Sequence, residues 1–335
     1  MNQLKVALIG SGNIAHHHAK AIKKIKNIKL VAVCGRDKEK VEKFGKKYKI
    51  NTYTDYDRLL KNEEIDMVDI VSVPSLHAGQ GIKAAKLGKH VLVEKPIDIS
   101  IERADQLIKV CKEKDVKLSV ISQHRFDKVF RIVKKMIEKG EFGRIVSIVV
   151  SLQKYRPQCY YNSWRGDKNY SGGGVVICHA IHYIDLLLWL MGPAKSVVGK
   201  ISSLNRSKVE DTGFSIIKFK NGSTGIINTT SVVSSLPTRI EIYGEKKSMI
   251  IEENRIVRIN KGNSYIDRFL SLIKSKLISL IPLPKNSFKE QIKDFVNAIK
   301  NNKNLLITGE DGKRALEVVL AIYESDKENK EILLK

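Results

Sequence analysis

The stretch "VALIGSGNIA", residues 6–15, decides the fold of the first third of the chain. It begins as a continuous apolar run, typical of a buried strand, and passes directly into a helical pattern. Gly10, Gly12 and Ala15 lie at this junction with G-x-G-x-x-A spacing. The spacing is far more specific between a strand and a helix than the same letters are elsewhere.

The junction predicts a dinucleotide-binding turn. Gly10 permits the tight turn, Gly12 lets the backbone approach a pyrophosphate, and Ala15 lets the helix pack closely on the strand. The N–H groups of Asn13 and Ile14, at the positive end of the helix dipole, suit phosphate oxygens. The alternative, a glycine turn in a domain without a ligand, fits the surrounding pattern less well.

Short apolar runs alternate with helical patterns over residues 1–120. Strands are expected at "LKVALIG", "KLVAVCG", "MVDIVSV", "HVLVEKP" and "KLSVIS". Helices are expected at Asn13–Lys24, Lys38–Tyr48, Asp55–Lys61, Ser75–Leu87 and Ile101–Glu113. This alternation predicts an α/β domain with a doubly wound parallel sheet, and we assign it residues 1–122.

The pattern changes after residue 122. Longer β runs follow, joined by turn sequences such as "KNGST" and "YGEKKS". A last pair of helices is expected near Lys289–Lys300 and Glu310–Ser325. We therefore predict a second, α+β domain with a largely antiparallel sheet over residues 123–335.

The formal net charge is +24, but lysines are scattered through every segment, without a basic block or a nucleic-acid-binding motif. We therefore expect no nucleic-acid partner and interpret the charge as a compositional habit of the source genome. The positive field can still help to attract an anionic substrate. The four cysteines form no C-x-x-C pair. Reduced thiols in a cytoplasmic protein fit this spacing better than a disulfide framework or a zinc ribbon.

The N-terminus shows a strand-like run instead of a signal-peptide pattern. Residues 265–284, "YIDRFLSLIKSKLISLIPLP", have an amphipathic helical pattern. A helix that packs on its own domain or on another subunit is the favoured interpretation, and a basic helix on a membrane surface is the alternative. We expect no stable membrane insertion.

The end of the second strand bears on the choice of dinucleotide. An acidic residue about 20 residues after the glycine turn commonly binds the adenosine ribose. Here the chain reads "VCGRDKEK", with Gly35 where an aspartate is expected. Arg36 can hold a 2′-phosphate or stack on adenine, and Asp37 can still reach the ribose. Spacing alone therefore leaves NAD and NADP open.

Two further strand ends carry polar groups, and ligands of such sheets bind beyond the carboxyl ends of the strands. "VSVPSLH" supplies Pro74 and His77, and "VLVEKPI" supplies Glu94 and Lys95 before Pro96. We place these residues in the cofactor site, with Lys95 over the nicotinamide region. A surface lysine is the alternative.

The stretch "GGGVVICHAIHYIDLLLWLMG", residues 172–192, runs three glycines into an apolar helix. Helical spacing puts Cys178, His182 and Asp185 on one face and His179 on an adjoining one. Metal ligands, catalytic groups and core residues are all compatible with this spacing. No further ligand cluster accompanies the face, so we expect no metal and favour a base or hydrogen-bonding role for His182.

An arginine- and aromatic-rich loop, "YRPQCYYNSWRG", precedes the glycines. Arginine binds carboxylate or phosphate oxygens bidentately, and aromatic rings stack on a sugar or a base. A loop anchored by its aromatic side chains is the alternative. The candidate substrate-binding residues are Arg156, Tyr161, Trp164 and Arg165, together with Arg125 after the last strand of the first domain.

Taken together, these motifs resemble the Gfo/Idh/MocA family of nicotinamide-dependent oxidoreductases. The matching elements "GSGNIA", "VPSLH", "EKP" and the H-x-x-D of His182 and Asp185 cover most of the chain. The resemblance implies a Rossmann domain followed by an α/β domain whose open sheet builds homodimers or homotetramers. It also implies that Lys95 and His182 face the substrate carbon.

Longer stretches, among them "RPQCYYNSWRGDKNYSGGG" and "HYIDLLLWLMGP", are similar to the branch that oxidises UDP-N-acetylglucosaminuronic acid at the sugar C3 for surface polysaccharides. Its members use NAD, which the resemblance therefore favours. They have an Asn-Gln pair where this chain has Cys178 and His179, and usually an acid where it has Gly35.

The leading hypothesis is an NAD(P)-dependent dehydrogenase of a nucleotide-linked sugar acid. Imidazole titrates near neutral pH, so His182 can take the hydroxyl proton, while Lys95 can stabilise a developing alkoxide. The sequence leaves open which of the two takes the proton. His179 is expected beside the substrate. Asp185 is counted with the substrate-binding candidates, either as a group that orients the site or as a residue with a buried structural hydrogen bond. Another sugar or cyclitol dehydrogenase and a non-catalytic NAD-binding regulator are the alternatives.

Overall fold

The computed structural model describes residues 3–204, 208–261 and 287–334. These residues form two compact units. The first contains the described residues of Met1–Gln123, Asn169–Gly172 and Asn286–Leu316, and the second contains those of His124–Lys168, Gly173–Lys285 and Glu317–Lys335. The amphipathic pattern over residues 265–284 lies outside the described residues.

The first unit is built on a six-stranded sheet with the strand order β3-β2-β1-β4-β5-β6, and every neighbouring pair is parallel. The predicted doubly wound sheet is confirmed. The order reverses between β1 and β4, so the glycine turn after β1 lies at the switch point where such sheets bind ligands. The strands are β1 Leu4–Ile9, β2 Ile28–Cys34, β3 Asn51–Tyr53, β4 Met67–Ile70, β5 His90–Val93 and β6 Leu118–Val120.

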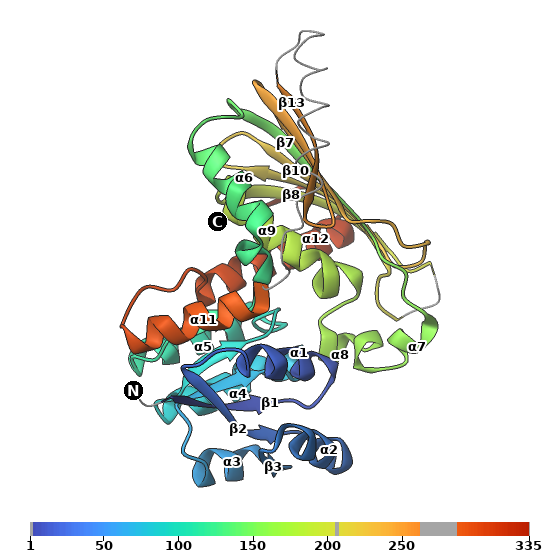
Figure 1. The fold of residues 1–335 in the computed structure, drawn as a ribbon. Coiled ribbons are helices and arrows are strands. Elements are labelled where there is room, and N and C mark those ends of the chain that lie inside the picture. The colour runs from blue at the N-terminus through green and yellow to red at the C-terminus, as the bar shows by residue number, and fades with distance from the viewer. Residues whose placement is uncertain (1–2, 205–207, 262–286, 335) are drawn as a thin grey trace. The chain divides into compact units, whose positions relative to one another are not determined.

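The helices that connect these strands follow the expected pattern (Figure 1). Two of them, α2 and α5, have the predicted bounds, because Asp37 and Ser100 cap them by accepting hydrogen bonds from Lys40 N and Arg103 N. The connecting helices are α1 Asn13–Ile22, α2 Lys38–Tyr48, α3 Tyr56–Asn62, the 3₁₀ turn η1 Pro74–Leu76, α4 His77–Lys86 and α5 Ile101–Glu113.

Helix α11, Ser287–Lys300, is distant in sequence but belongs to the first unit. Its Ile292 and Phe295 are buried in the same apolar cluster as Ala19 and Ile22 of α1. The helix that begins at the glycine turn is therefore packed against a segment from the end of the chain.

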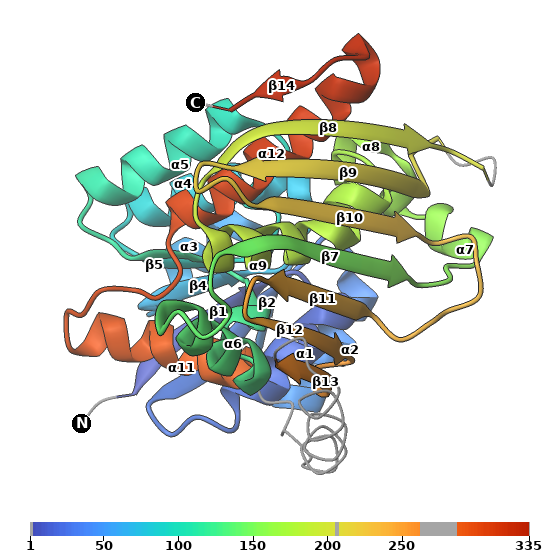
Figure 2. The same cartoon turned by 90° about the horizontal axis from the view of Figure 1, so that it is seen from above.

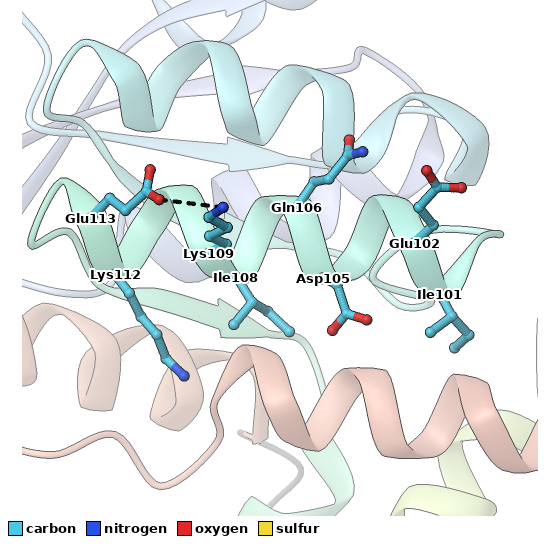
Figure 3. Close-up of a pocket in the computed structure, with 8 residues that line it drawn as sticks. All are labelled: Ile101, Glu102, Asp105, Gln106, Ile108, Lys109, Lys112 and Glu113. Atoms are coloured by element: carbon cyan, nitrogen blue, oxygen red, sulfur yellow. Dashed lines mark ion pairs between the residues drawn. The ribbon is translucent and has the colours of Figure 1, made fainter.

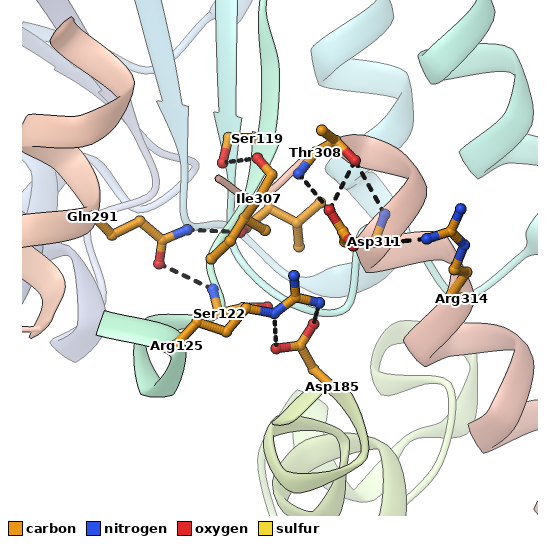
Figure 4. A network of polar contacts seen from close by, with 10 residues as sticks. Ser119, Ser122, Arg125, Asp185, Gln291, Ile307, Thr308, Asp311 and Arg314 are labelled. Atoms are coloured by element: carbon orange, nitrogen blue, oxygen red, sulfur yellow. Dashed lines mark hydrogen bonds and ion pairs between the residues drawn. The ribbon is translucent and has the colours of Figure 1, made fainter. Parts of the chain in front are cut away.

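Polar contacts from α11 also fix the end of β6 (Figure 4). Gln291 of α11 donates from Nε2 to the Val120 carbonyl at 2.8 Å and accepts from Ser122 N at 3.0 Å. Helix α12, Gly309–Glu328, begins against this strand. A Cβ at Gly312 would lie 2.4 Å from Val120 Cγ2, so glycine permits the close approach.

The second unit is built on an open eight-stranded sheet with the order β13-β12-β11-β7-β10-β9-β8-β14 (Figure 2). The prediction of a largely antiparallel sheet is confirmed, because among the described strands of this sheet only β7 and β10 pair in parallel. The strands are β7 Ile145–Gln153, β8 Ala194–Ser202, β9 Thr212–Phe219, β10 Thr224–Thr230, β11 Arg239–Gly244, β12 Lys247–Glu252, β13 Arg255–Lys261 and β14 Ile332–Leu333.

One face of this sheet is covered by the apolar helix α9, Ile181–Met191, and by the π-helical turn η4, Val176–Ala180, that precedes it. A Cβ at Gly225 of β10 would meet Leu187 of α9 at 3.0 Å, and one at Gly213 would meet Val176 at 2.6 Å. The remaining helical segments are η2 Gln123–Phe126, α6 Lys128–Glu138, α7 Gln158–Tyr161, η3 Trp164–Gly166, α8 Lys168–Ser171, the π-helical turn η4 Val176–Ala180 and α9 Ile181–Met191.

The other face of the sheet carries an exposed apolar row. Val198 of β8 pairs with Ile216 of β9, and Ile216 pairs with Ile226 of β10. These three side chains are 41%, 45% and 37% exposed. We call them, with the half-exposed Phe214, the open-face row. Contiguous exposed apolar side chains of this kind are typical of interaction surfaces.

By length and composition, the helical stretch Lys168–Met191 could cross a membrane. However, 67% of its most apolar window is buried inside the protein. The core helix of a folded domain has the same length and composition, so the stretch is weak support for a membrane span.

Candidate functional site

The glycine turn after β1 has the geometry that its sequence predicts. Gly10 has φ +128°, and a Cβ there would lie 2.7 Å from the Val71 carbonyl oxygen. Gly12 differs, since nothing lies within 4 Å of the position that its Cβ would take. Ala15 is fully buried. The turn is therefore tight at its first glycine and open at its second.

The N-terminus of α1 is free for an anion. Gly12 is its N-cap residue, and no side chain caps the helix there. The first N–H groups of a helix without a side-chain cap need another acceptor, and phosphate oxygens satisfy them well. Asn13 and Ile14 open this helix. The residues present thus fit the pyrophosphate of a dinucleotide.

The end of β2 combines a glycine with an exposed arginine. A Cβ at Gly35 would lie 2.9 Å from both Ser11 Oγ and Val41 Cγ2, so there is little space for a side chain at this position. Asp37 is engaged elsewhere: it caps α2 and pairs with Lys40 at 2.7 Å, and the hydrogen bond from Lys40 lowers its pKa. Within the described residues, the exposed Arg36 has no acidic partner.

The segment after β5 carries Glu94 and Lys95 at the carboxyl end of the sheet. Glu94 is buried, and its Oε2 accepts a hydrogen bond from Lys95 N at 3.1 Å. The Lys95–Pro96 peptide bond is cis. The sequence thus placed the lysine correctly at a strand end.

His77 links the segments after β4 and β5. Its ring is buried, with Nδ1 at 2.7 Å from the Pro96 carbonyl and Nε2 at 3.2 Å from the Ser72 carbonyl. Burial lowers its pKa. A neutral ring has one proton to donate, and the shorter contact to Pro96 favours Nδ1. Pro74, also buried, opens the turn between β4 and His77.

In the second unit, the predicted single helix begins with a π-helical turn. Cys178 and His179 lie on this turn, η4, and His182 is the second residue of α9. Single π-helical turns inserted in helices occur frequently at functional sites. The His182 ring lies edge-on to His124, with centroids 5.6 Å apart.

Arg125 and Asp185 form a buried bidentate ion pair (Figure 4). Arg125 donates from Nε to Oδ2 at 2.9 Å and from Nη2 to Oδ1 at 2.7 Å. The two residues are only 3% and 2% exposed. The pair fixes α9 one turn after His182. Their predicted contact with substrate stays a prediction, and the observed contact indicates a positioning role.

The glycine run packs on two polar residues that the sequence did not single out. Glu210 is buried and accepts hydrogen bonds from Gly174 N at 2.7 Å, Val176 N at 3.1 Å and the Tyr323 hydroxyl at 2.7 Å. A Cβ at Gly174 would lie 1.7 Å from the Glu210 carbonyl oxygen. Glycine is therefore required for this close approach to the Glu210 backbone, and the Glu210 carboxylate anchors the start of the helix carrying His182.

Two arginines of the 155–166 loop stack on one tyrosine. The guanidinium carbons of Arg156 and Arg165 lie 5.1 Å and 4.8 Å from the Tyr160 ring centre, and Arg165 also stacks on Trp164. The Tyr160 hydroxyl lies 3.1 Å from His179 Nε2. Burial raises the pKa of Tyr160 to about 12, so the phenol stays protonated.

This cluster has the chemistry of an anion site. Within the described residues neither arginine has an acidic partner, and Arg156 Nε is buried without a hydrogen-bond partner. Guanidinium groups of this kind suit carboxylate or phosphate oxygens. Tyr161 points elsewhere, since its hydroxyl bonds to Ser231 Oγ at 2.5 Å in the interior.

A shallow pocket of about 790 Å³ on the first unit contains none of the predicted site residues. It is lined by α5 alone (Figure 3), and most of its charged groups are already paired. Lys109 pairs with Glu113 at 3.8 Å and Lys112 with Glu310 at 2.7 Å. We therefore do not assign the site to it. Across the described ranges, no three His, Cys, Asp or Glu residues gather as metal ligands.

Comparison with known protein families identifies the class of protein. Residues 4–122 match the oxidoreductase family model for the NAD-binding Rossmann fold, and residues 134–334 match the model for the C-terminal alpha/beta domain. The chain therefore belongs to the Gfo/Idh/MocA family of oxidoreductases, and its first unit is an NAD-binding Rossmann domain.

Individual relatives differ in the substrates that their names give. By structure, the chain is similar to the WlbA dehydrogenases of Bordetella pertussis (TM-score 0.90, 28% identity, 100% of this chain and 98% of that one) and Chromobacterium violaceum (0.89, 26%, 100% and 97%). Both were solved in complex with NADH and UDP-GlcNAcA. By sequence, it is 25% identical to the myo-inositol 2-dehydrogenase of Thermotoga maritima, over 99% of each chain.

Proposed function

We propose that the protein is an NAD(P)-dependent dehydrogenase that oxidises the C3 hydroxyl of UDP-N-acetylglucosaminuronate, in the supply of sugars for surface polysaccharides. One observation carries the choice of substrate: the similarity over the whole chain to two dehydrogenases solved with NADH and UDP-GlcNAcA. In this proposal residues 1–122 bind the cofactor, and residues 123–335 bind the substrate and form the oligomer.

The arginine cluster supports an anionic substrate. Arg156 and Arg165 offer guanidinium groups without acidic partners in the described part of the chain, beside aromatic rings. A nucleotide-linked uronic acid offers both a carboxylate and a diphosphate. Trp164 and Tyr160 provide faces on which a sugar or a base can stack. We assign His179 to the same subsite through its contact with Tyr160.

The reaction removes a hydride from carbon and a proton from oxygen. NAD(P), when bound, accepts the hydride. We propose that His182 takes the hydroxyl proton on its ring and that the Lys95 ammonium donates a hydrogen bond to the same oxygen, stabilising the charge that develops there. Arg125 and Asp185 act through their buried pair, which holds the helix of His182 in place.

A second candidate substrate is a cyclitol. The relation to myo-inositol 2-dehydrogenase favours it, because an inositol also presents a secondary alcohol but carries no charge. The two candidate substrates differ in their need for the arginine cluster. UDP-N-acetylglucosaminuronate carries negative charges that the two guanidinium groups can bind, whereas an inositol carries none.

The assay mixes the purified protein with UDP-N-acetylglucosaminuronate or myo-inositol and with NAD or NADP, and follows reduced cofactor by absorbance. We expect turnover of the sugar nucleotide. Its absence with both cofactors, or turnover of inositol alone, contradicts the proposal. Lys95→Ala is the control: turnover should fall by about 10² or more while NADH still binds. If the protein were a non-catalytic regulator, neither the wild type nor Lys95→Ala would turn over substrate.

We further propose a cytoplasmic homodimer or homotetramer. The open-face row supports the oligomer, since it leaves an apolar surface that a second copy would cover. The free Cys34 and Cys111, both buried, are compatible with a reducing compartment.

A further inference from the structure

Three ionisable side chains meet in the interior of the first unit. The proposed reaction uses none of them, but it uses Lys95, which follows one of the three in the chain. His18 of α1 has Nδ1 at 2.8 Å from Asp69 Oδ2 and Nε2 at 3.1 Å from Glu94 Oε1. His18 and Asp69 are fully buried, and Glu94 is 7% exposed. Asp69 lies on β4 and Glu94 follows β5, so one ring joins a helix to two strands.

The contacts determine the protonation of this ring. Both ring nitrogens face carboxylate oxygens. Ionised carboxylates only accept hydrogen bonds, so beside two ionised carboxylates both nitrogens donate and the ring is an imidazolium. Burial opposes the charge, but the negative charge of Asp69 and the hydrogen bonds that the ring donates to both carboxylates outweigh burial and raise the pKa of His18 to about 10. Burial likewise opposes ionisation of Glu94, yet the hydrogen bond and charge of His18 keep its pKa below the usual value.

Glu94 connects this cluster to the lysine. Its Oε1 binds His18 and its Oε2 accepts the hydrogen bond from Lys95 N, so the carboxylate is held at both oxygens. His18 lies on the helix that begins at the glycine turn. Phe288 of α11 packs edge-on against the ring at 5.2 Å and contributes to its enclosure.

We propose that His18 is a positioning residue. As a buried cation it holds the Glu94 carboxylate, and through Glu94 it fixes the position of the Lys95 backbone relative to α1, the helix proposed to bind the cofactor phosphates. The catalytic consequence rests on the proposed function of Lys95. The structural part, an imidazolium that fixes the Glu94–Lys95 segment, does not.

The physical argument turns on charge. A buried carboxylate that loses its cation must take up a proton or move toward water, since an uncompensated charge in the interior is strongly unfavourable. A neutral amide in place of the imidazolium keeps a donor but removes the charge. Either response of Glu94 weakens the hydrogen bond that its carboxylate accepts from Lys95 N.

The first test uses the unaltered protein. NMR of its histidine side chains should show one ring with both nitrogens protonated from pH 6 to pH 9. If every ring, including His18, is neutral at pH 8, the inference is wrong. This measurement needs neither a substrate nor a variant, so it stands whatever the enzyme oxidises.

The second test compares His18→Gln with His17→Gln, a neighbouring exposed histidine on the same helix. We expect His18→Gln to speed amide hydrogen exchange at Lys95 at least tenfold and to lower kcat about tenfold or more, with KM for the cofactor changed less than threefold. His17→Gln should change neither. Unchanged exchange at Lys95 overturns the inference, and so does an equal loss across the whole first unit, which indicates a purely structural role.

The two proposals fail in distinguishable ways. If the wild type oxidises no sugar nucleotide, the assignment of the reaction fails while the exchange and protonation measurements still decide the role of His18. If His18→Gln does not fold, the double variant His18→Gln/Glu94→Gln leaves one buried carboxylate without a cation, that of Asp69, instead of two, and it should fold better than the single variant. A double variant as unstable as the single one contradicts the charge argument.

Discussion

At the scale of single residues, Arg36 is the side chain most able to decide between the two cofactors. It is exposed, lacks an acidic partner in the described part of the chain, and follows Gly35, where no carboxylate is available to repel a 2′-phosphate. We expect Arg36→Ala to weaken NADPH binding about tenfold, near 1.4 kcal/mol, and NADH binding less than twofold. Fluorescence titration of both reduced cofactors measures this.

Lys38→Ala is the matched control for Arg36→Ala, because Lys38 is an exposed cation two residues further along. It should leave the ratio of the two affinities unchanged. Equal weakening of NADH and NADPH by Arg36→Ala would assign the side chain to adenine stacking instead of phosphate binding.

The buried pair of Arg125 and Asp185 gives a prediction about stability. Asp185→Asn leaves the guanidinium buried without its anion, so we expect a loss of about 3–5 kcal/mol in the free energy of unfolding. The double variant Arg125→Met/Asp185→Leu removes both charges and should recover most of it. Both tryptophans, Trp164 and Trp189, belong to the second unit, so their fluorescence during urea unfolding reports on this unit.

A loss below about 1 kcal/mol for Asp185→Asn would show that water or another group replaces the carboxylate. A double variant no more stable than the single one would point to packing instead of charge as the source of the loss.

Residue-level prediction from sequence succeeded where the signal is local. The glycine turn and the strand-end Lys95 follow from short motifs beside strands. Arg125 and Asp185 are 60 residues apart, and His18 and Glu94 are 76 residues apart. No local pattern pairs such residues, so the cation that holds Glu94 was not expected. For Asp185 the sequence predicted an orienting role or a buried hydrogen bond, but it did not identify Arg125 as the partner.

At the scale of elements, the two glycines of the turn have different functions. Gly12 has extended backbone dihedrals that any residue adopts, and its Cβ position faces open space. We therefore expect Gly12→Ala to change the melting temperature by less than about 2 °C but to weaken NADH binding at least tenfold, because the added methyl lies where the pyrophosphate approaches. Thermal unfolding and NADH titration measure the two effects separately.

Gly10→Ala is the contrasting variant. Its positive φ and the nearby Val71 carbonyl make any side chain there strained, so it should lower the melting temperature. If Gly12→Ala binds NADH as tightly as the wild type, the dinucleotide does not approach the turn at that residue.

Helix bounds were predictable where a cap or a turn residue marks them. Lys38–Tyr48 and Ile101–Glu113 have the expected ends. Helix α6 was not predicted, although Val129, Phe130 and Val133 form its buried side. The π-helical turn at Val176–Ala180 was missed for a different reason: it is held by Glu210 and Tyr323, which lie in distant parts of the chain. Glu210 accepts a hydrogen bond from Gly174 N, and the Tyr323 hydroxyl accepts one from Ile177 N.

At the scale of the whole molecule, long-range pairing limits what the sequence reveals. The return of α11 to the first unit and the parallel pairing of β7 with β10 join segments far apart in the chain. Alternation of apolar residues predicts that strands exist and which side is buried, but it carries no information about which strand lies beside which. The fold class was therefore predictable, while the strand order was not.

The open-face row gives the last prediction, which concerns assembly. Its side chains are already exposed in one chain, so a charge placed there costs the fold little but opposes burial against a second copy, which a stable interface requires over about 800 Å² per partner. We expect Ile216→Lys to convert the oligomer to monomers with an unchanged circular dichroism spectrum, measured by size-exclusion chromatography with light scattering. Leu87→Lys, at an exposed residue of the first unit, is the control and should leave the mass unchanged. A wild type that is monomeric at micromolar concentration, or an Ile216→Lys variant with the wild-type mass, contradicts assembly through this face.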